Sequence, residues 1–408
     1  MTRLTAATAR EFDLSKVSNA FALNPYPDFK TLRRYAPICK QPDGSYVLSR
    51  YEEVKQVLGD AELFSSDKKI DFYPRFGDSP LYEHHTTSIV FNDPPYHTRV
   101  RKLLGPFFAA RVLRKMEQSI QHMVDGLLDI AAANEPIDIV KEFATVIPLN
   151  LIGDLLGVPF DEREPLKIWA NTILGALEPI RTPQQLEDGN AAVVEFKSYL
   201  TDLIAHKRKH PPDDDAMDVL WALVQASESG AGLSEVEILH NSIFMLNAGH
   251  DTTGSLIANG VDLLLRYPQQ AKQLTAHPEL MKSAIEEMLR FESPLQIGNR
   301  RTTRETTIGE QRIPAGTYLH LLIASANRDE LEFANPDEFL IDRSPNRHLA
   351  FSHGIHTCAG NAVARIEAGI AFGRLLERFP NISRAGDTVR PQRSRFRVVE
   401  KLPVNLNP

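Results

Sequence analysis

The sequence predicts a mainly α-helical protein with a smaller β-rich portion. Apolar residues recur at three- and four-residue spacing, and residues 112–210 contain several such helical patterns separated by prolines. The longest pattern runs from Ser234 to Tyr267, which corresponds to about 50 Å of helix. The strand patterns are short by comparison, and the clearest are Tyr46–Leu48 and Tyr318–Ile323.

The composition is that of a globular chain with an ample core. Of 408 residues, 42% are hydrophobic and 24% are charged, and the net charge of −7 argues against a nucleic-acid partner. Two cysteines, Cys39 and Cys358, offer no disulfide framework, which suits a reducing cytoplasm. The N-terminal segment lacks an apolar run typical of a signal or membrane span. We therefore expect a cytoplasmic protein without a membrane partner, with one domain over residues 1–408.

Helices and short strands alternate near the N-terminus. Helical patterns cover Tyr26–Tyr35 and Tyr51–Leu58. The segment from Ser65 to Val90 contains two prolines and a glycine, which indicate a long irregular loop. After a Pro-Pro pair, a helix begins that places His97 and Arg101 one turn apart on the same face.

The long helix has clear ends and an unusual middle. Ser234 and Glu237 form a capping box at its start. Its middle is Ala248-Gly-His-Asp-Thr-Thr-Gly254, a run of poor helix formers. The Thr252 hydroxyl is placed to bond the carbonyl oxygen of Ala248, which bends a helix. A distorted helix makes room for a ligand, although the same run also suits a buried kink.

The next helix is predicted from Pro278 to about Phe291. Within it, Glu287 and Arg290 are three residues apart and therefore adjacent, as in many pairs on helix surfaces. Strands follow, and the adjacent Arg300 and Arg301 point to opposite faces because side chains alternate along a strand.

The segment from Phe351 to Gly360 precedes an amphipathic helix predicted at Asn361–Phe379. It contains Cys358, whose thiolate form is favoured at a helix N-terminus. Gly354 lies four residues before this cysteine and Gly360 two residues after it. A lone cysteine is more often a small buried hydrophobe. A zinc site of His353, His356 and Cys358 is disfavoured, because three ligands within six residues do not match the usual zinc spacing.

Phe351, Gly354, Cys358 and Gly360 form the pattern Phe-x-x-Gly-x-x-x-Cys-x-Gly, which resembles the haem-ligand loop of the cytochromes P-450. Four further motifs occur in the order found in that family and extend the resemblance over the whole chain. They are His97 with Arg101, Ala248 to Thr253, Glu287 with Arg290, and Arg300.

The resemblance implies haem b as cofactor, O2 as co-substrate and a role for each motif. Cys358 is the expected iron ligand. Asp251 is the expected acid and Thr252 the alcohol of proton delivery, since the reaction of O2 consumes two protons. Other cofactor-binding residues implied are His97, Arg101, Ala248, Arg300, Phe351, Gly354, His356 and Gly360.

The resemblance also implies a buried Glu287–Arg290 pair with a third partner. Many members of the family carry an arginine where this chain has Glu338, so His348 is the expected substitute. Arg301 remains a rival to Arg300 as a propionate ligand, because the two occupy opposite faces of one strand.

The activity implied is that of a bacterial monooxygenase, which inserts one oxygen atom into a C–H bond by hydroxylation or O-dealkylation. No segment resembles an attached reductase, so a separate ferredoxin and its reductase are expected, with a monomeric enzyme. Two alternatives are a peroxide-driven haem-thiolate enzyme and a non-catalytic haem-binding sensor or carrier. The presence of Asp251 and Thr252 argues against both.

A pocket for a small, mostly apolar organic substrate is expected along the haem. Gln296 and Arg395 are its polar candidates outside the loop from Ser65 to Val90. A solvent-facing Arg395, the commoner situation for arginine, favours a neutral substrate, whereas a buried one would pair with a substrate carboxylate. The lining residues implied by the resemblance, besides that loop and Ala248, are Phe244, Met245, Leu295, Gln296, Ile297, Arg395 and Phe396.

Basic residues gather in and after the helix that carries His97. We expect them to form a docking patch for an acidic ferredoxin, although the whole chain is acidic. They are Arg99, Lys102, Arg111, Arg114 and Lys115.

Overall fold

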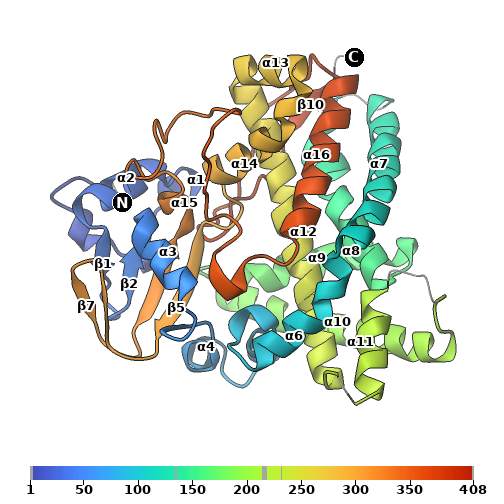
Figure 1. Ribbon diagram of the computed structural model, residues 1–408, viewed down its shortest axis with the longest axis horizontal. Coiled ribbons are helices and arrows are strands. Elements are labelled where there is room, and N and C mark those ends of the chain that lie inside the picture. The colour runs from blue at the N-terminus through green and yellow to red at the C-terminus, as the bar shows by residue number, and fades with distance from the viewer. Residues whose placement is uncertain (1–2, 134–135, 214–217, 231, 407–408) are drawn as a thin grey trace.

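The computed structural model describes residues 3–133, 136–213, 218–230 and 232–406. A large helical region occupies one side of the molecule, and a smaller region with most of the strands occupies the other (Figure 1). The predicted fold class, mainly α with a smaller β-rich portion, is confirmed. The helices are α1 (Asn19–Leu23), α2 (Tyr26–Tyr35), α3 (Tyr51–Gly59), α4 (Lys69–Phe76), α5 (Pro80–Thr87), α6 (Tyr96–Leu104), α7 (Ala110–Ala132), α8 (Val146–Leu156), α9 (Glu164–Gly175), α10 (Pro183–Lys209), α11 (Val219–Glu228), α12 (Glu235–Arg266), α13 (Pro268–Ala276), α14 (Met281–Phe291), α15 (Ile323–Ala326) and α16 (Asn361–Arg378).

The largest described sheet has five strands in the order β1-β2-β8-β5-β3. Strands β2 and β8 are parallel, and the other neighbours are antiparallel. Two smaller sheets have the orders β4-β10-β9 and β6-β7. The strands are β1 (Ile38–Lys40), β2 (Tyr46–Leu48), β3 (Phe64–Ser65), β4 (Ile137–Asp138), β5 (Ile297–Thr302), β6 (Thr306–Ile308), β7 (Gln311–Ile313), β8 (Tyr318–Leu322), β9 (Ser383–Arg384) and β10 (Pro403–Asn405).

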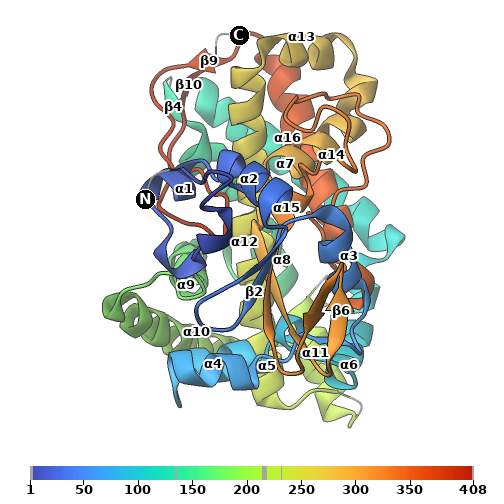
Figure 2. The same ribbon diagram turned by 90° about the vertical axis from the view of Figure 1, so that its left-hand side faces the viewer.

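Helix α12 crosses the molecule and organises the helical region around it. It contacts α8, α9, α14 and α16, and α16 runs beside it in Figure 1. In the view of Figure 2, the strands lie on the near side and α12 runs behind them. Its predicted capping box is confirmed, because the Ser234 side chain accepts from the Glu237 amide and the Glu237 side chain accepts from the Ser234 amide.

The prediction of an irregular loop from Ser65 to Val90 was wrong, since most of this segment folds into α4 and α5. Pro74 lies within α4, and Pro80 occupies the first turn of α5. A proline in the first turn loses no helical hydrogen bond, because that amide would be unpaired anyway. Ser79 caps α5 by accepting a hydrogen bond from the Tyr82 amide at 3.2 Å. Pro80 therefore marks the start of a helix, and Pro74 does not prevent the short helix α4 from forming.

Among the described residues, no single helix combines the length and apolar character needed to cross a membrane. One bent pair, Val140–Leu156 with Phe160–Gly175, meets the requirement by length and composition alone.

Candidate active site

Cys358 lies at the end of a tight loop that leads into α16. Its amide donates to the carbonyl oxygen of Phe351 at 2.9 Å, and its own carbonyl oxygen accepts from the Asn361 side chain at 2.6 Å. Asn361 is the first residue of α16, so the two bonds tie the cysteine to both ends of the loop. The Arg365 guanidinium lies 4.6 Å from the centre of the Phe351 ring and covers it.

The two glycines of the loop have different reasons to be glycine. Gly354 has a φ of +74°, and a Cβ there would approach the Leu58 carbonyl oxygen to 2.7 Å. Gly360 has an ordinary φ of −85°, and the nearest described atom to an added Cβ would be in Phe108, at 3.9 Å. The protein around Gly360 therefore leaves room for a side chain, as expected where a flat group fills that space.

Burial raises the pKa of the Cys358 thiol in this chain, against the expectation that the helix start alone favours a thiolate. The Gly360 amide, Arg101 and Arg365 act in the opposite direction. A metal ion that binds the sulfur would ionise it outright. Cys39, the other cysteine, is buried among the carbonyl oxygens of Ala9, Arg10 and Phe12.

Four predicted cofactor-binding residues come together next to this loop. The ring centres of His97 and His356 are 4.2 Å apart. Arg101 donates to the carbonyl oxygen of Thr357 at 2.8 Å. Arg300 donates to the carbonyl oxygen of Asn299 at 2.8 Å and is buried. The motifs from α6, β5 and the cysteine loop thus converge, although 256 residues separate Arg101 from Thr357.

The buried positive charge of these residues, and their ring nitrogens that are unpaired in the described part of the chain, favour the binding of an anion. Burial lowers the pKa of His356 to about 2, with Arg300 as the next cause, and burial lowers the pKa of Arg300 to about 10. Buried ring nitrogens of His97 and His356 have no hydrogen-bond partner among the described residues. Two propionate carboxylates would satisfy these donors, so the residues present fit a haem.

Arg301, the rival propionate ligand, is already engaged in an ion pair. Its guanidinium pairs with the Asp71 carboxylate, with Nε donating to Oδ1 at 2.8 Å, and it also donates to the Gly316 carbonyl oxygen. The alternation along β5 therefore gives Arg301 an acidic partner on α4 and leaves Arg300 beside His97 and His356.

The middle of α12 remains helical through Ala248 and Thr252. The Thr252 hydroxyl donates to the carbonyl oxygen of Ala248 at 2.5 Å, as predicted. A Cβ on Gly249 would meet the Ile152 side chain at 2.6 Å, so the glycine lets α8 pack closely. His250 is buried, which lowers its pKa to about 4.

Asp251 is a buried carboxyl group without a hydrogen-bond donor on Oδ2 among the described residues. Burial raises its pKa, and Arg393 opposes this with Nη1 at 4.0 Å from Oδ2. The adjacent acid and alcohol thus differ, because Thr252 is partly exposed while Asp251 is buried.

Glu287 and Arg290 form a fully buried pair, with Arg290 Nε donating to Glu287 Oε2 at 2.7 Å and Nη2 to Oε1 at 2.8 Å. The predicted third partner was wrong. Arg343 donates to Glu287 Oε2 at 3.0 Å, whereas His348 contacts Glu286 at 3.0 Å. His348 meets the neighbouring, less buried carboxylate, and the longer arginine reaches Glu287 while also donating to the Glu338 carbonyl oxygen.

An aromatic and aliphatic cluster contains some of the residues predicted to line the substrate pocket. It includes the predicted Phe396 and, at its edge, Leu295, and these two residues also form a β-bridge. Predicted Phe244 and Met245 are half-buried and pack on the main core. Ile297 packs with the N-terminal residues, in a different cluster. The cluster consists of Phe72, Phe91, Leu174, Leu177 and Phe396, with Phe76, Tyr82, Val90, Leu295 and Val398 packed against it.

The two polar candidates are both buried. Gln296 donates from Nε2 to the Ser293 carbonyl oxygen at 2.6 Å, and its Oε1 has no partner among the described residues. The Arg395 guanidinium lies 2.8 Å from the Asn299 side-chain amide, which also lies 2.9 Å from the Tyr318 hydroxyl. Arg395 therefore does not face solvent. A solvent-facing Arg395 was the reason for favouring a neutral substrate, so that preference no longer holds.

Arg181, at this end of the pocket, escaped the sequence analysis, whereas Phe72, Phe76 and His85 fall within the expected lining segment from Ser65 to Val90 without being singled out. Phe72, Phe76 and His85 come from α4 and α5, and Arg181 from the connection between α9 and α10. The signal was present, because Phe72 and Phe76 are four residues apart and share one helix face.

The family model described as cytochrome P-450 matches residues 38–277 and 273–404. A similar curated protein is cytochrome P-450 107B1 from Saccharopolyspora erythraea, 39% identical over 96% of this chain and 97% of its own length. The vitamin D(3) 25-hydroxylase of Pseudonocardia autotrophica is 35% identical over 99% of both chains.

Two solved structures are also similar. The structure of P450BioI in complex with acyl carrier protein ligated to hexadec-9Z-enoic acid has a TM-score of 0.88 at 33% identity, and the match covers 94% of this chain and 99% of that one. CYP109E1 from Bacillus megaterium in complex with testosterone has a TM-score of 0.88 at 30% identity, with coverage of 96% and 100%.

Proposed function

This chain belongs to the cytochrome P-450 family, and from that premise we propose that it oxidises a small, mostly apolar organic substrate with electrons from a separate ferredoxin and its reductase. As a member of the family it is a monooxygenase that uses haem b and O2. The proposed reaction inserts one oxygen atom into a C–H bond, by hydroxylation or O-dealkylation. We further propose a cytoplasmic monomer whose residues 1–408 form one domain.

The residues around the cysteine loop are suited to hold the haem. Cys358 would supply the sulfur ligand, His97, Arg101 and Arg300 would bind the propionates, and His356 would lie beside them. Phe351, Gly354 and Gly360 shape the loop, and Ala248 presents the α12 face. When bound, the haem supplies the oxidising chemistry, since a thiolate ligand favours O–O cleavage. The observation that carries the proposal is the set of basic side chains next to Cys358, namely His97, His356 and Arg300, which form no ion pair with a carboxylate among the described residues.

Asp251 and Thr252 are proposed to deliver protons. The Thr252 hydroxyl donates to the Ala248 carbonyl oxygen, so its own oxygen is free to accept a hydrogen bond from water. Asp251 retains a proton more readily than an exposed carboxyl group, because burial raises its pKa. An acid with a raised pKa, next to an alcohol that can hold water, would relay protons from the buried side of α12 to the substrate side.

One experiment distinguishes the proposed monooxygenase from its two alternatives. Reduced ferredoxin and O2, with no added peroxide, should convert substrate to a hydroxylated or dealkylated product. A peroxide-driven enzyme would turn over only when peroxide is added, and a sensor or carrier would bind substrate without turnover in either case.

Thr252→Ala is expected to keep haem and substrate binding but to divert most reducing equivalents to hydrogen peroxide. The reason is that the alcohol orders the water that carries the protons, a contribution of about 10²-fold or more in catalysis. The measurement is product formed per reductant consumed, with peroxide quantified in parallel. Thr275→Ala is the matched control, because the exposed Thr275 hydroxyl also bonds a carbonyl four residues back, that of Ala271 at 3.1 Å. Unchanged coupling in Thr252→Ala would remove the alcohol from the mechanism.

The proposed ferredoxin patch is narrower than the sequence suggested. Arg99 forms an ion pair with Glu237 and is therefore engaged within the chain. The exposed basic residues that remain are Lys102, Arg111, Arg114 and Lys115.

Arg111→Glu combined with Arg114→Glu is expected to slow electron transfer from ferredoxin by about tenfold or more at low salt, because the steering charge is reversed. The difference should shrink as salt is added. Stopped-flow reduction rates measure the effect. Arg304→Glu, at an exposed position near β6, is the control. Equal rates for the double variant and the control at low salt would contradict the patch.

A further inference from the structure

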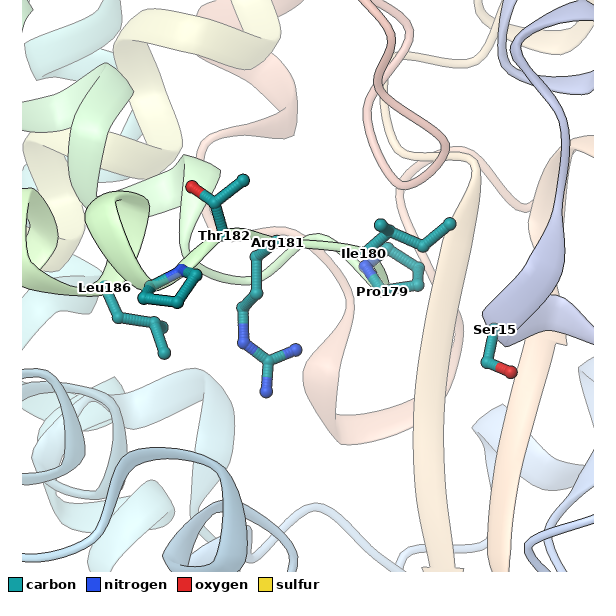
Figure 3. A pocket seen from close by; sticks show the side chains of 7 residues that line it. Ser15, Pro179, Ile180, Arg181, Thr182 and Leu186 are labelled. Carbon is teal, nitrogen blue, oxygen red and sulfur yellow. The ribbon is translucent and has the colours of Figure 1, made fainter.

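The connection between α9 and α10 borders a cleft of about 450 Å³. Pro179, Ile180, Arg181 and Thr182 line it, together with Ser15 from the N-terminal segment. Figure 3 shows the Arg181 side chain extending from this connection, between Leu186 on one side and Pro179 and Ile180 on the other.

In the part of the chain that the structure describes, the charged end of Arg181 has no acidic partner. Its guanidinium carbon lies 5.7 Å from the centre of the Phe76 ring, and Nη1 donates to the Glu178 carbonyl oxygen at 3.4 Å. Its Nε is buried and has no hydrogen-bond partner among the described residues. Burial and then the nearby Arg75 lower the pKa of Arg181, so the two like charges already disfavour each other.

Arg75 and Arg395 extend the positive charge inward. Arg75 lies 5.7 Å from the centre of the Tyr318 ring, and the buried Arg395 contacts the side chain of Asn299 beside the same tyrosine. Burial lowers the pKa of Arg395, Tyr318 and Glu178 oppose this, and Arg75 acts in the same direction as burial. Three arginines from α4, the α9–α10 connection and the C-terminal segment therefore approach one region with neutral side chains as their partners.

Two acids, Asp71 and Glu178, lie near this group, but neither forms an ion pair with its three arginines among the described residues. Asp71 pairs with Arg301 and lies 3.7 Å from Lys68. Glu178 accepts from the amides of Ser394 and Arg395 at 2.9 and 3.0 Å, and burial raises its pKa. Its other carboxylate oxygen has no partner in the described part of the chain. Arginines that converge in a partly dry region without a counter-charge are costly unless an anion joins them.

An apolar surface continues from this group toward the site. The Phe76 ring, on which Arg181 lies, contacts Phe72 edge-on at 5.4 Å between centres, and Phe72 contacts Phe91 at 5.2 Å. These rings belong to the cluster that also contains Phe396. A ligand that satisfies both regions has a charged end and an apolar body.

We propose that Arg75, Arg181 and Arg395 form a binding site for the carboxylate of the substrate, which makes this a monooxygenase of apolar organic acids. The planar guanidinium groups match a carboxylate, because both groups present two atoms in parallel. The inference rests on the proposed function, since it names the substrate class of that enzyme.

The test compares carboxylic acids with their primary amides, which have nearly the same shape and no charge. Pairs with linear, terpenoid and aromatic bodies are titrated into the holoenzyme by calorimetry and by the low- to high-spin shift. For the body that fits, the acid is expected to bind at least about tenfold more tightly than the amide. Arg181→Gln and Arg75→Gln should each weaken the acid about tenfold, toward the affinity of its amide, whereas Arg304→Gln should not.

Two results would overturn the proposal. In the first, the acid and its amide bind with equal affinity for every apolar body that binds at all. In the second, Arg181→Gln and Arg75→Gln weaken the binding of acid and amide equally. The carbon monoxide spectrum of each reduced sample is recorded alongside. An intact thiolate band with equal affinities removes the carboxylate site alone, whereas a wild-type protein without that band removes the haem-thiolate proposal itself.

Discussion

Cys358→His is expected to abolish the long-wavelength Soret band of the reduced, carbon-monoxide-bound protein. That band depends on a thiolate bound to iron, and an imidazole is a neutral ligand that donates less electron density. The loop should persist, because its bonds from the Cys358 amide to Phe351 and from Asn361 to the Cys358 carbonyl oxygen involve the backbone of residue 358. The measurement is the difference spectrum with and without carbon monoxide.

Cys39→Ala is the control for this variant. Cys39 is buried in the N-terminal cluster with Phe12 and Val47, so its loss leaves a small cavity but should not alter the spectrum. A band lost in Cys39→Ala and kept in Cys358→His would show that Cys39, and not Cys358, binds the iron.

Glu287→Gln is expected to lower the free energy of unfolding by about 3–5 kcal/mol, because it leaves two arginines without their carboxylate in the interior. Arg290 and Arg343 both donate to Glu287, and so does the Leu340 amide at 2.9 Å. Glutamine keeps the shape of the side chain but removes its charge. Urea unfolding followed by the Soret band and by far-ultraviolet circular dichroism measures the change.

Glu286→Gln is the matched control one residue earlier in α14. Glu286 pairs with Arg365 and His348 but is partly exposed, so its loss should cost only about 1 kcal/mol. Equal destabilisation by the two variants would show that burial of the Glu287 pair adds nothing.

The sequence by itself determined the features that depend on residues close together in the chain. The capping box joins Ser234 and Glu237, the hydroxyl of Thr252 bonds Ala248, and Arg290 pairs with Glu287. Each bond closes within about one helical turn, where the repeat of the helix fixes which side chains meet. The mainly helical fold class followed from the same periodicity, and the order of the motifs indicated the family.

Only the tertiary structure decided which distant residues meet. Arg343, 56 residues from Glu287, completes that pair, and the partners of Arg395 come from β5 and β8. The pKa of the Cys358 thiol and the burial of Asp251 likewise depend on what packs around them. The physical reason is that desolvation and long-range pairing arise when separate segments pack together, and neither is encoded in the spacing of residues along one segment.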